Sequence, residues 1–153
     1  MKSFSLSVVL LAFIPFFTTA FRKDYPYETV KQLDILGRVL YPTITFPCSE
    51  MPHVCANMEN AIQNGAPSQL YYLKNATQTA INRRASGCPK LQREHGNSTT
   101  SCDEYPFAST QQGGAGAFIR LVPRVENSRQ GGYLSQFYRQ NIPNGGYFNV
   151  DFN

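Results

Sequence analysis

Hydrophobic and polar positions in the first half of the chain predict short strands that alternate with helices. β-branched and aromatic residues at positions 43–46 predict a short strand. A helix of about ten residues is predicted next, because apolar residues recur at helical spacing until the Asn-Gly pair at positions 64–65. These apolar residues are Val54, Met58, Ala61 and Ile62. A second strand is predicted at residues 69–74.

The middle of the chain predicts a second helix followed by a loop. Asn75 or Thr77 can cap a helix that runs to Gly87, where a glycine is typical of a helix end. Residues 90–101 are polar and are expected to form a loop.

The last third of the chain predicts a strand, a helix and a closing strand. Apolar residues alternate in 117–124, and the helix is expected within 126–141, capped by Asn127 or Ser128. One face of this helix is apolar and carries Tyr133, Leu134, Phe137 and Tyr138. Residues 147–152 alternate again. We therefore predict the α+β class, as one small domain with a short antiparallel sheet.

The N-terminus has the pattern of an export signal. Lys2 precedes an apolar run at 6–17, which is shorter than the ~20 residues that a membrane-spanning helix needs. We predict a signal peptide at 1–20, an arm or pro-segment at 21–37 and a domain at 38–153. The mature protein is expected to be secreted, extracellular and monomeric, without stable membrane association.

Four cysteines are expected to form disulfides, since the chain is predicted to be exported and has no C-x-x-C pair. Of three possible pairings we favour Cys48 with Cys55 and Cys88 with Cys102, because each closes a short loop. Two sequons also predict surface glycosylation, at Asn75 and Asn97.

The charge of the chain is mildly basic. The formal net charge is +4, and loss of Lys2 with the signal leaves 13 basic and 10 acidic residues, a net of +3. Four arginines and one acid, Glu126, lie between Arg120 and Arg139. This distribution fits either an ordinary solvated face or a surface that binds a polyanion.

Four residues near the glycine-rich stretch could bind a hard divalent cation through oxygen atoms: Asp103, Glu104, Glu126 and Asn127. A phosphodiester hydrolase needs such a cation, a base and arginines that hold the polyanion. The glycines after Thr110 are expected to form the turn of a hairpin.

Other roles for these residues stay open. The acidic pair could be a solvated turn, although a disulfide at Cys102 would fix it on one side. Glu126 could be a metal ligand, bind through water or form a structural ion pair, and Asn127 could be a cap as well as a ligand. His53 is expected to cap or to lie at the edge of the core, and His95 to be exposed.

The segments "CDEYPFAST", "GGAGAFIRLVP" and "ENSRQGGYLSQFY" together resemble the NucA/NucB family of secreted deoxyribonucleases. The upstream segments "ITFPCSEMPHVCANMENAIQNG" and "INRRASG" resemble the family's opening strand and helices. The resemblance covers residues 44–152. It implies a domain related to the ββα-metal nucleases, in which two antiparallel strands and a helix hold one divalent ion, with Mg or Mn expected.

The resemblance also implies roles for individual residues. Asp103, with Glu104 beside it, occupies the position of the catalytic base, and Asn127, with Glu126 beside it, matches the metal ligand on the helix. Arg120 matches the arginine on the strand after the glycines, and Arg129 is expected to bind phosphate with it. Weaker supporting roles are expected for Gln130 and Gln136.

The sequence departs from the related families in two ways. No histidine matches the usual base of the wider superfamily, and Tyr105 stands where tryptophan is common. The expected function is metal-dependent cleavage of DNA with little sequence preference. The alternatives are an RNase and an inactive nucleic-acid-binding or toxin-like protein on the same scaffold.

Overall fold

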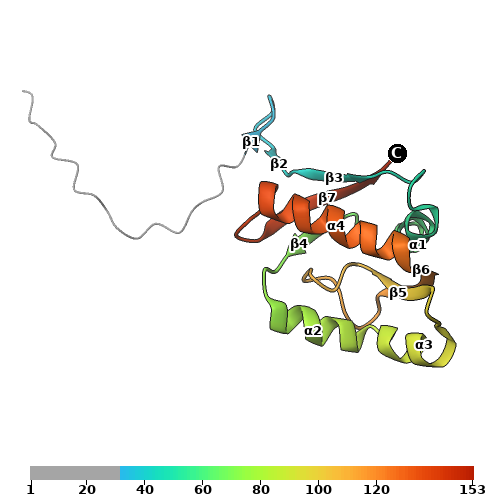
Figure 1. The fold of residues 1–153 in the computed structure, drawn as a ribbon. Helices are drawn as coiled ribbons and strands as arrows, with labels where there is room; N and C mark the ends of the chain where they lie inside the picture. Colours follow the sequence, from blue (N-terminus) through green and yellow to red (C-terminus); the bar gives the residue numbers. More distant parts are fainter. Residues whose placement is uncertain (1–31) are drawn as a thin grey trace, which may run out of the picture. The chain divides into compact units, whose positions relative to one another are not determined.

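The structure, a computed structural model, describes residues 32–153 (Figure 1). In chain order its elements are β1 (Gln32–Leu33), β2 (Val39–Leu40), β3 (Thr43–Phe46), α1 (Pro52–Gln63), β4 (Gln69–Tyr72), α2 (Ala76–Ala85), α3 (Cys88–His95), β5 (Thr100–Tyr105), β6 (Phe118–Pro123), α4 (Arg124–Asn141) and β7 (Gly146–Phe152). The predicted signal peptide and most of the predicted arm lie outside these residues, although β1 falls at the arm's end. No helix in this part of the chain has the length and apolar character to cross a membrane.

The strands form one three-stranded sheet and two separate pairs. The sheet has the order β3-β7-β4, with β4 antiparallel and β3 parallel to β7. β5 pairs with β6, and β1 with β2, both antiparallel. The α+β class is confirmed, whereas the main sheet is mixed and the prediction was of a short antiparallel sheet. Parallel pairing of β3 with β7 is possible because the two strands lie at opposite ends of the described chain and no tight turn joins them.

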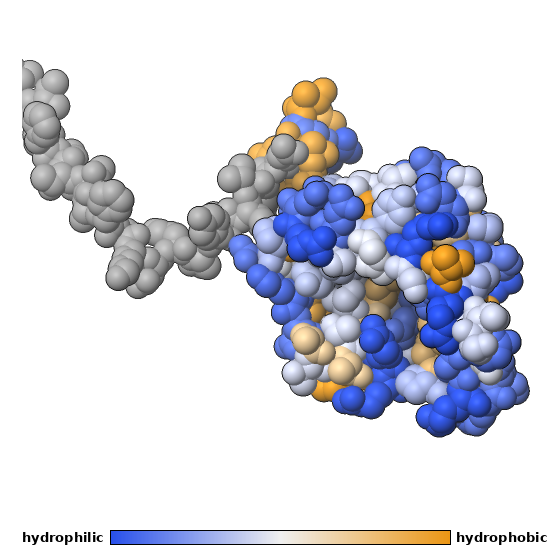
Figure 2. Space-filling view, viewed as in Figure 1, coloured by the Kyte–Doolittle hydropathy of each residue, from blue (hydrophilic) through white to orange (hydrophobic). Residues whose placement is uncertain are grey.

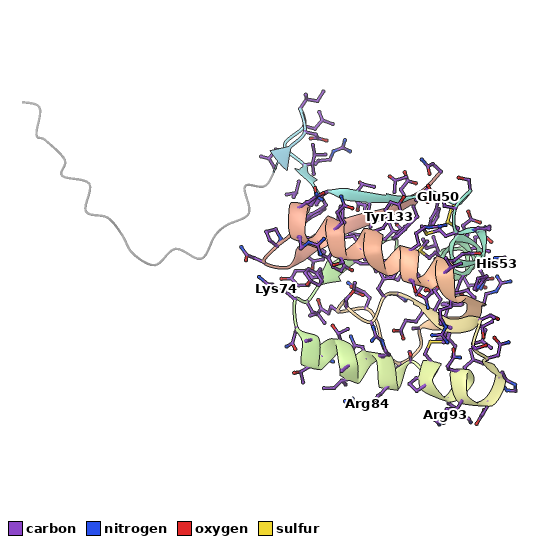
Figure 3. All side chains as sticks on the ribbon, in the orientation of Figure 1. Glu50, His53, Lys74, Arg84, Arg93 and Tyr133 are labelled. Carbon is purple, nitrogen blue, oxygen red and sulfur yellow. A yellow bond between two sulfur atoms is a disulfide. The ribbon has the colours of Figure 1, made fainter. Side chains whose placement is uncertain are left out.

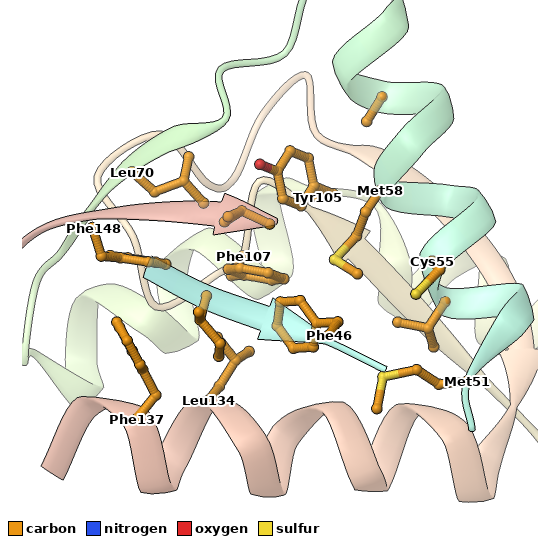
Figure 4. Packing of buried hydrophobic residues seen from close by; sticks show 14 of the residues in the cluster. Phe46, Met51, Cys55, Met58, Leu70, Tyr105, Phe107, Leu134, Phe137 and Phe148 are labelled. Carbon is orange, nitrogen blue, oxygen red and sulfur yellow. The ribbon is translucent and has the colours of Figure 1, made fainter. Parts of the chain in front are cut away.

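A single hydrophobic core lies between the three-stranded sheet and helices α1 and α4 (Figure 4). Phe46 of β3 and Phe148 of β7 are fully buried, as are Met58 of α1 and Tyr105 of β5. Each such side chain contributes about 1.5–3 kcal/mol by leaving water. α1 also packs on the β5–β6 pair, so the core fixes this pair beside α4.

Both predicted disulfides are confirmed. Cys48 bonds to Cys55, with 5.6 Å between their Cα atoms, and joins the segment after β3 to α1. Cys88 bonds to Cys102, with a Cα separation of 5.5 Å, and joins α3 to β5. A disulfide typically stabilises a fold by about 2–4 kcal/mol. The second one therefore holds in place the strand that carries Asp103.

The prediction of a loop at residues 90–101 was wrong, because this stretch contains most of α3 and the start of β5. Gly87 turns the chain with a φ of +90°, and a proline follows in the first turn of α3, where its missing N–H is not needed. The helix is short and its composition is polar. Its position is fixed by the disulfide at Cys88 and by Gln92, whose Nε2 donates to the Thr100 carbonyl over 3.3 Å.

The two predicted helix starts had opposite outcomes. Asn75 is confirmed as the cap of α2, since its Oδ1 accepts a hydrogen bond from the Gln78 N–H over 2.9 Å. Asn127 and Ser128 do not cap α4, because this helix already begins at Arg124. The Asn127 amide instead binds β5, so its side chain is used for a contact between elements.

The glycine-rich stretch lies in the connection between β5 and β6, as predicted for a hairpin turn. Gly114 has a φ of +106°, a conformation that favours glycine. Gly113 packs directly on the backbone of Phe107, so that an added Cβ would lie 2.2 Å from the Phe107 carbonyl oxygen.

Gly113→Ala is therefore expected to destabilise the protein by about 1–3 kcal/mol, because backbone atoms must move to admit the methyl group. Gly132→Ala is the matched control, since a Cβ there meets nothing within 4 Å. On a helix this control is expected to gain about 0.5–1 kcal/mol. Urea unfolding measures both, and equal stabilities of the two variants would contradict the packing described here.

Candidate active site

A cavity of about 230 Å³ lies between β5, α4, α2 and the loop after β5. Four of the predicted site residues line it: Asp103, Glu104, Asn127 and Gln130. Arg83 of α2 lines the same cavity. The residues that line the cavity thus include both acids of the pair, an amide of α4 and a guanidinium, although the two acidic side chains leave β5 on opposite faces.

The order β5, β6, α4 explains how these residues meet. β5 and β6 are antiparallel, with Asp103 opposite Arg120 in the register, and α4 follows β6 directly. This is the element order expected of a ββα unit. The Asn127 side chain, in the first turn of α4, donates from Nδ2 to the Cys102 carbonyl over 2.9 Å. The start of α4 is thereby held beside the residue that precedes Asp103.

Asp103 is a buried carboxylic acid whose pKa is shifted toward neutrality. Its exposed fraction is 2%, and its Oδ2 accepts a hydrogen bond from Asn57 Nδ2 over 2.9 Å. Burial raises the pKa of Asp103 to about 6, although hydrogen bonds from Asn57 and Gln130 act in the opposite direction. A carboxyl group with this pKa can take up and release a proton near neutral pH, as a general base must.

Glu104 leaves one oxygen without a protein partner. Its Oε1 lies 3.7 Å from Arg83 Nε, whereas Oε2 is buried and has no hydrogen bond within residues 32–153. Successive side chains of a strand point to opposite faces, so Asp103 faces α1 and Glu104 faces α2. A buried carboxylate oxygen without a donor is costly unless a cation or water binds it.

Asn127 presents a fixed amide oxygen to the same cavity. Its Nδ2 donates to both Ser101 Oγ and the Cys102 carbonyl, each over 2.9 Å. Since both hydrogen bonds use the nitrogen, Oδ1 remains free to accept from, or coordinate, a group in the cavity.

Glu104 Oε2 and Asn127 Oδ1 are oxygen ligands of the kind that a hard divalent cation prefers. In the described part of the chain, no three side chains of His, Cys, Asp or Glu gather at one point. A cation would therefore be held by Glu104 and the Asn127 amide, with water completing its shell. Mg²⁺ is commonly bound in this way, through one or two carboxylates with several waters retained.

Glu126 lies outside this cavity, although it was predicted as a metal ligand. Its Oε2 accepts from the backbone N–H groups of His53 (2.8 Å) and Val54 (3.3 Å), and its Oε1 lies 2.7 Å from His53 Nδ1. Burial raises the pKa of Glu126, but these hydrogen bonds outweigh it and hold the pKa below its ordinary value. Glu126 therefore caps the N-terminus of α1 and contacts His53, a structural role other than the ion pair considered for it.

Three further predicted residues are not among the residues that line the cavity. Arg129 binds Glu50, with 3.6 Å between Nε and Oε2, and Glu50 lies just before α1 (Figure 3). Arg120 is exposed on β6, and Gln136 is exposed on α4. Arg120 is the cross-strand neighbour of Asp103, but no hydrogen bond or ion pair joins the two within residues 32–153, and neither Arg129 nor Gln136 lines the cavity.

Two residues of the site were missed by the sequence analysis. Neither Arg83 nor Asn57 was singled out, although Asn57 is 3% exposed and binds Asp103. The contacts join residues distant in sequence, so neither could be found from local spacing. The available signal was that both lie within segments that resemble the family, Arg83 in "INRRASG" and Asn57 in "ITFPCSEMPHVCANMENAIQNG".

Comparison with known protein families matches residues 57–151 to the family described as deoxyribonuclease NucA/NucB. The chain belongs to the NucA/NucB family. The matched stretch contains Asn57 and every residue that lines the cavity. A search of curated proteins found no match to this chain. NucA/NucB membership confirms the resemblance seen in the sequence and supports a nuclease function with DNA as the substrate.

Proposed function

We propose that this protein is a secreted, metal-dependent endonuclease that hydrolyses DNA with little sequence preference. The observation that carries the proposal is that Asp103, Glu104, Asn127 and Arg83 line one cavity in a chain of a deoxyribonuclease family. A phosphodiester hydrolase needs a base, oxygen ligands for a cation and a group that binds phosphate. This cavity offers one candidate for each role.

Asp103 is the proposed general base. With a pKa of about 6 it is largely ionised at pH 7, yet basic enough to accept a proton from an attacking water. Asn57 holds Oδ2 of this carboxylate and so orients it. The proton taken from water then resides on Asp103, where burial favours the neutral acid.

Glu104 and Asn127 are the proposed cation ligands, through Glu104 Oε2 and Asn127 Oδ1. A Mg²⁺ or Mn²⁺ ion bound there would neutralise negative charge on the phosphate and the leaving oxygen. Arg83 is positioned beside Glu104 and would hold a non-bridging phosphate oxygen by charge-assisted hydrogen bonds. Contacts of this kind are made to the backbone of the nucleic acid and carry no base information, which supports low sequence preference.

Secretion is supported by the predicted signal at residues 1–20, by the sequon at Asn97 and by the two disulfides. Disulfides persist in oxidising compartments. Asn97 is exposed, as N-glycosylation requires, whereas the side chain of the other sequon asparagine, Asn75, caps α2. A monomer without stable membrane association remains our expectation for the mature protein.

Parallel digestion of plasmid DNA and RNA, with Mg²⁺ or Mn²⁺ and with excess EDTA, tests the proposal. We expect DNA to be cut at many sites when the cation is present and left intact with EDTA. Cleavage that persists in EDTA would reject the metal-dependent scheme. Cleavage of RNA alone would favour the RNase, and binding without cleavage of either would favour an inactive binding protein.

A further inference from the structure

A second hollow, of about 1080 Å³, opens beside the active-site cavity between α2 and α4. Four residues line both: Arg83, Ser109, Gly131 and Leu134. The hollow, which we call the α2–α4 groove, is therefore continuous with the cavity. The face of the molecule that carries these two helices is largely hydrophilic (Figure 2).

One face of each helix forms a wall of the α2–α4 groove. The residues of α2 that line the groove lie on one helix face, since they recur every three to four positions: Ala76, Thr79, Ala80 and Arg83. The residues of α4 that line the groove also lie on one helix face and include Gly131, Ser135 and Arg139, which are four positions apart. Small side chains keep the groove open, since a Cβ added at Gly131 would meet nothing within 4 Å.

The charge of the groove has one sign. Lys74, Arg83 and Arg139 line it, and among residues 32–153 no acidic residue does. Arg139 donates from Nη1 to Ser135 Oγ over 2.6 Å, which holds its guanidinium at the wall. Lys74 has a φ of +47°, an uncommon conformation for a residue with a side chain, where the chain passes from β4 into α2.

The N-terminus of α2 also lines the groove, and its first turn contains no acidic residue. The free backbone N–H groups and the dipole of a helix N-terminus favour anions. From Ala76 to Arg83 the helix rises about 10 Å, and a stacked nucleic-acid strand carries one phosphate per ~3.4 Å. The wall thus matches about three successive phosphates.

We propose that the α2–α4 groove binds the phosphates of a single nucleic-acid strand next to the phosphate that is cut. The inference rests on the proposed function for the position of the cut phosphate. The volume of about 1080 Å³ lies at the upper end of the range for small-molecule sites, which is room for several units of a polymer. The strand would run from the cavity, past Arg83, toward Lys74 and Arg139.

The test is binding of a fluorescein-labelled twelve-nucleotide DNA single strand, measured by anisotropy over a series of salt concentrations. All proteins carry Asp103→Asn and are measured in EDTA, so that no cleavage occurs. One variant adds Lys74→Gln and Arg139→Gln. Its matched control adds Arg84→Gln and Arg93→Gln, which remove the same charge from exposed positions that do not line the groove (Figure 3).

The groove pair is expected to weaken binding at least tenfold and to reduce the slope of log K against log salt by about 1.4, since each phosphate contact on a single strand contributes about 0.7. The control pair should change affinity less than threefold. A second comparison uses Ala80→Glu, which places a carboxylate in the groove, against Ala85→Glu at an exposed position of α2 outside it. Only Ala80→Glu should weaken binding.

The outcomes separate this inference from the proposed function. If the groove pair and the control pair weaken binding equally, and Ala80→Glu binds like Ala85→Glu, the groove inference is overturned even though the parent cleaves DNA. If the parent cleaves nothing while the groove variants alone weaken binding, the nuclease proposal fails and the groove inference stands.

Discussion

Asp103→Asn is expected to lower kcat for DNA cleavage by about 10²–10⁴-fold, the usual contribution of a general base. Asparagine has nearly the same shape and can still accept a hydrogen bond from Asn57, but it cannot take a proton from water. Initial rates on a defined DNA duplex measure the effect. Asp151→Asn is the matched control, because Asp151 is exposed on β7, and it should cleave like the parent.

The same substitution should change stability in a pH-dependent way. Folding raises the pKa of Asp103 from 3.8 to about 6, so the folded protein binds more protons and stability falls as pH rises through this window. Above pH 6 the ionised carboxylate costs about 3 kcal/mol, at 1.36 kcal/mol per pKa unit.

Asp103→Asn removes this cost. It should therefore be more stable than the parent at pH 7, and the difference should shrink below pH 4. Urea unfolding of the variant and the parent at pH 4 and pH 7 measures this stability difference. A variant less stable than the parent at pH 7 but equal to it at pH 4 would contradict the buried, raised pKa.

Glu104→Gln is expected to weaken cation binding about 10–100-fold, because it removes the only charged ligand proposed for the ion. Activity should be lost at low Mg²⁺ and partly recovered at high Mg²⁺. Such a recovery would show that the variant loses activity because it binds the cation less tightly. Titration of the cleavage rate and calorimetry with Mn²⁺ measure the shift. Glu94→Gln, at an exposed position of α3, is the control, and the same cation dependence in both variants would remove Glu104 from the site.

The elements with strong local patterns could be predicted from the sequence. The strand Thr43–Phe46 alternates exposed and buried residues, the apolar face of α1 recurs at helical spacing, and Asn75 has the chemistry of a cap. The polar helix Cys88–His95 could not be found in this way, because a disulfide and contacts with β5 hold it. Local propensity carries little information when tertiary contacts determine a short helix.

The acidic pair and Asn127 were predicted as site residues, and the structure places them at one cavity. Glu126 is next to Asn127 in the sequence, but this did not place it at the same cavity. Consecutive residues of a helix point about 100° apart, so Asn127 faces β5 while Glu126 reaches the start of α1. The partner of Glu126, His53, is 73 positions away, and no local pattern joins them.

The pH dependence of a single DNA turnover tests the central claim most directly, which is that the buried Asp103 carboxylate acts as the base. With cation and substrate saturating, the rate should rise with pH until Asp103 is ionised and level off above that point, which burial shifts to higher pH and the bound cation shifts to lower pH. Asp103→Asn should lose this titration, whereas Asp151→Asn should keep it. A parent rate without such a rise, or a rise that Asp103→Asn keeps, would contradict the account.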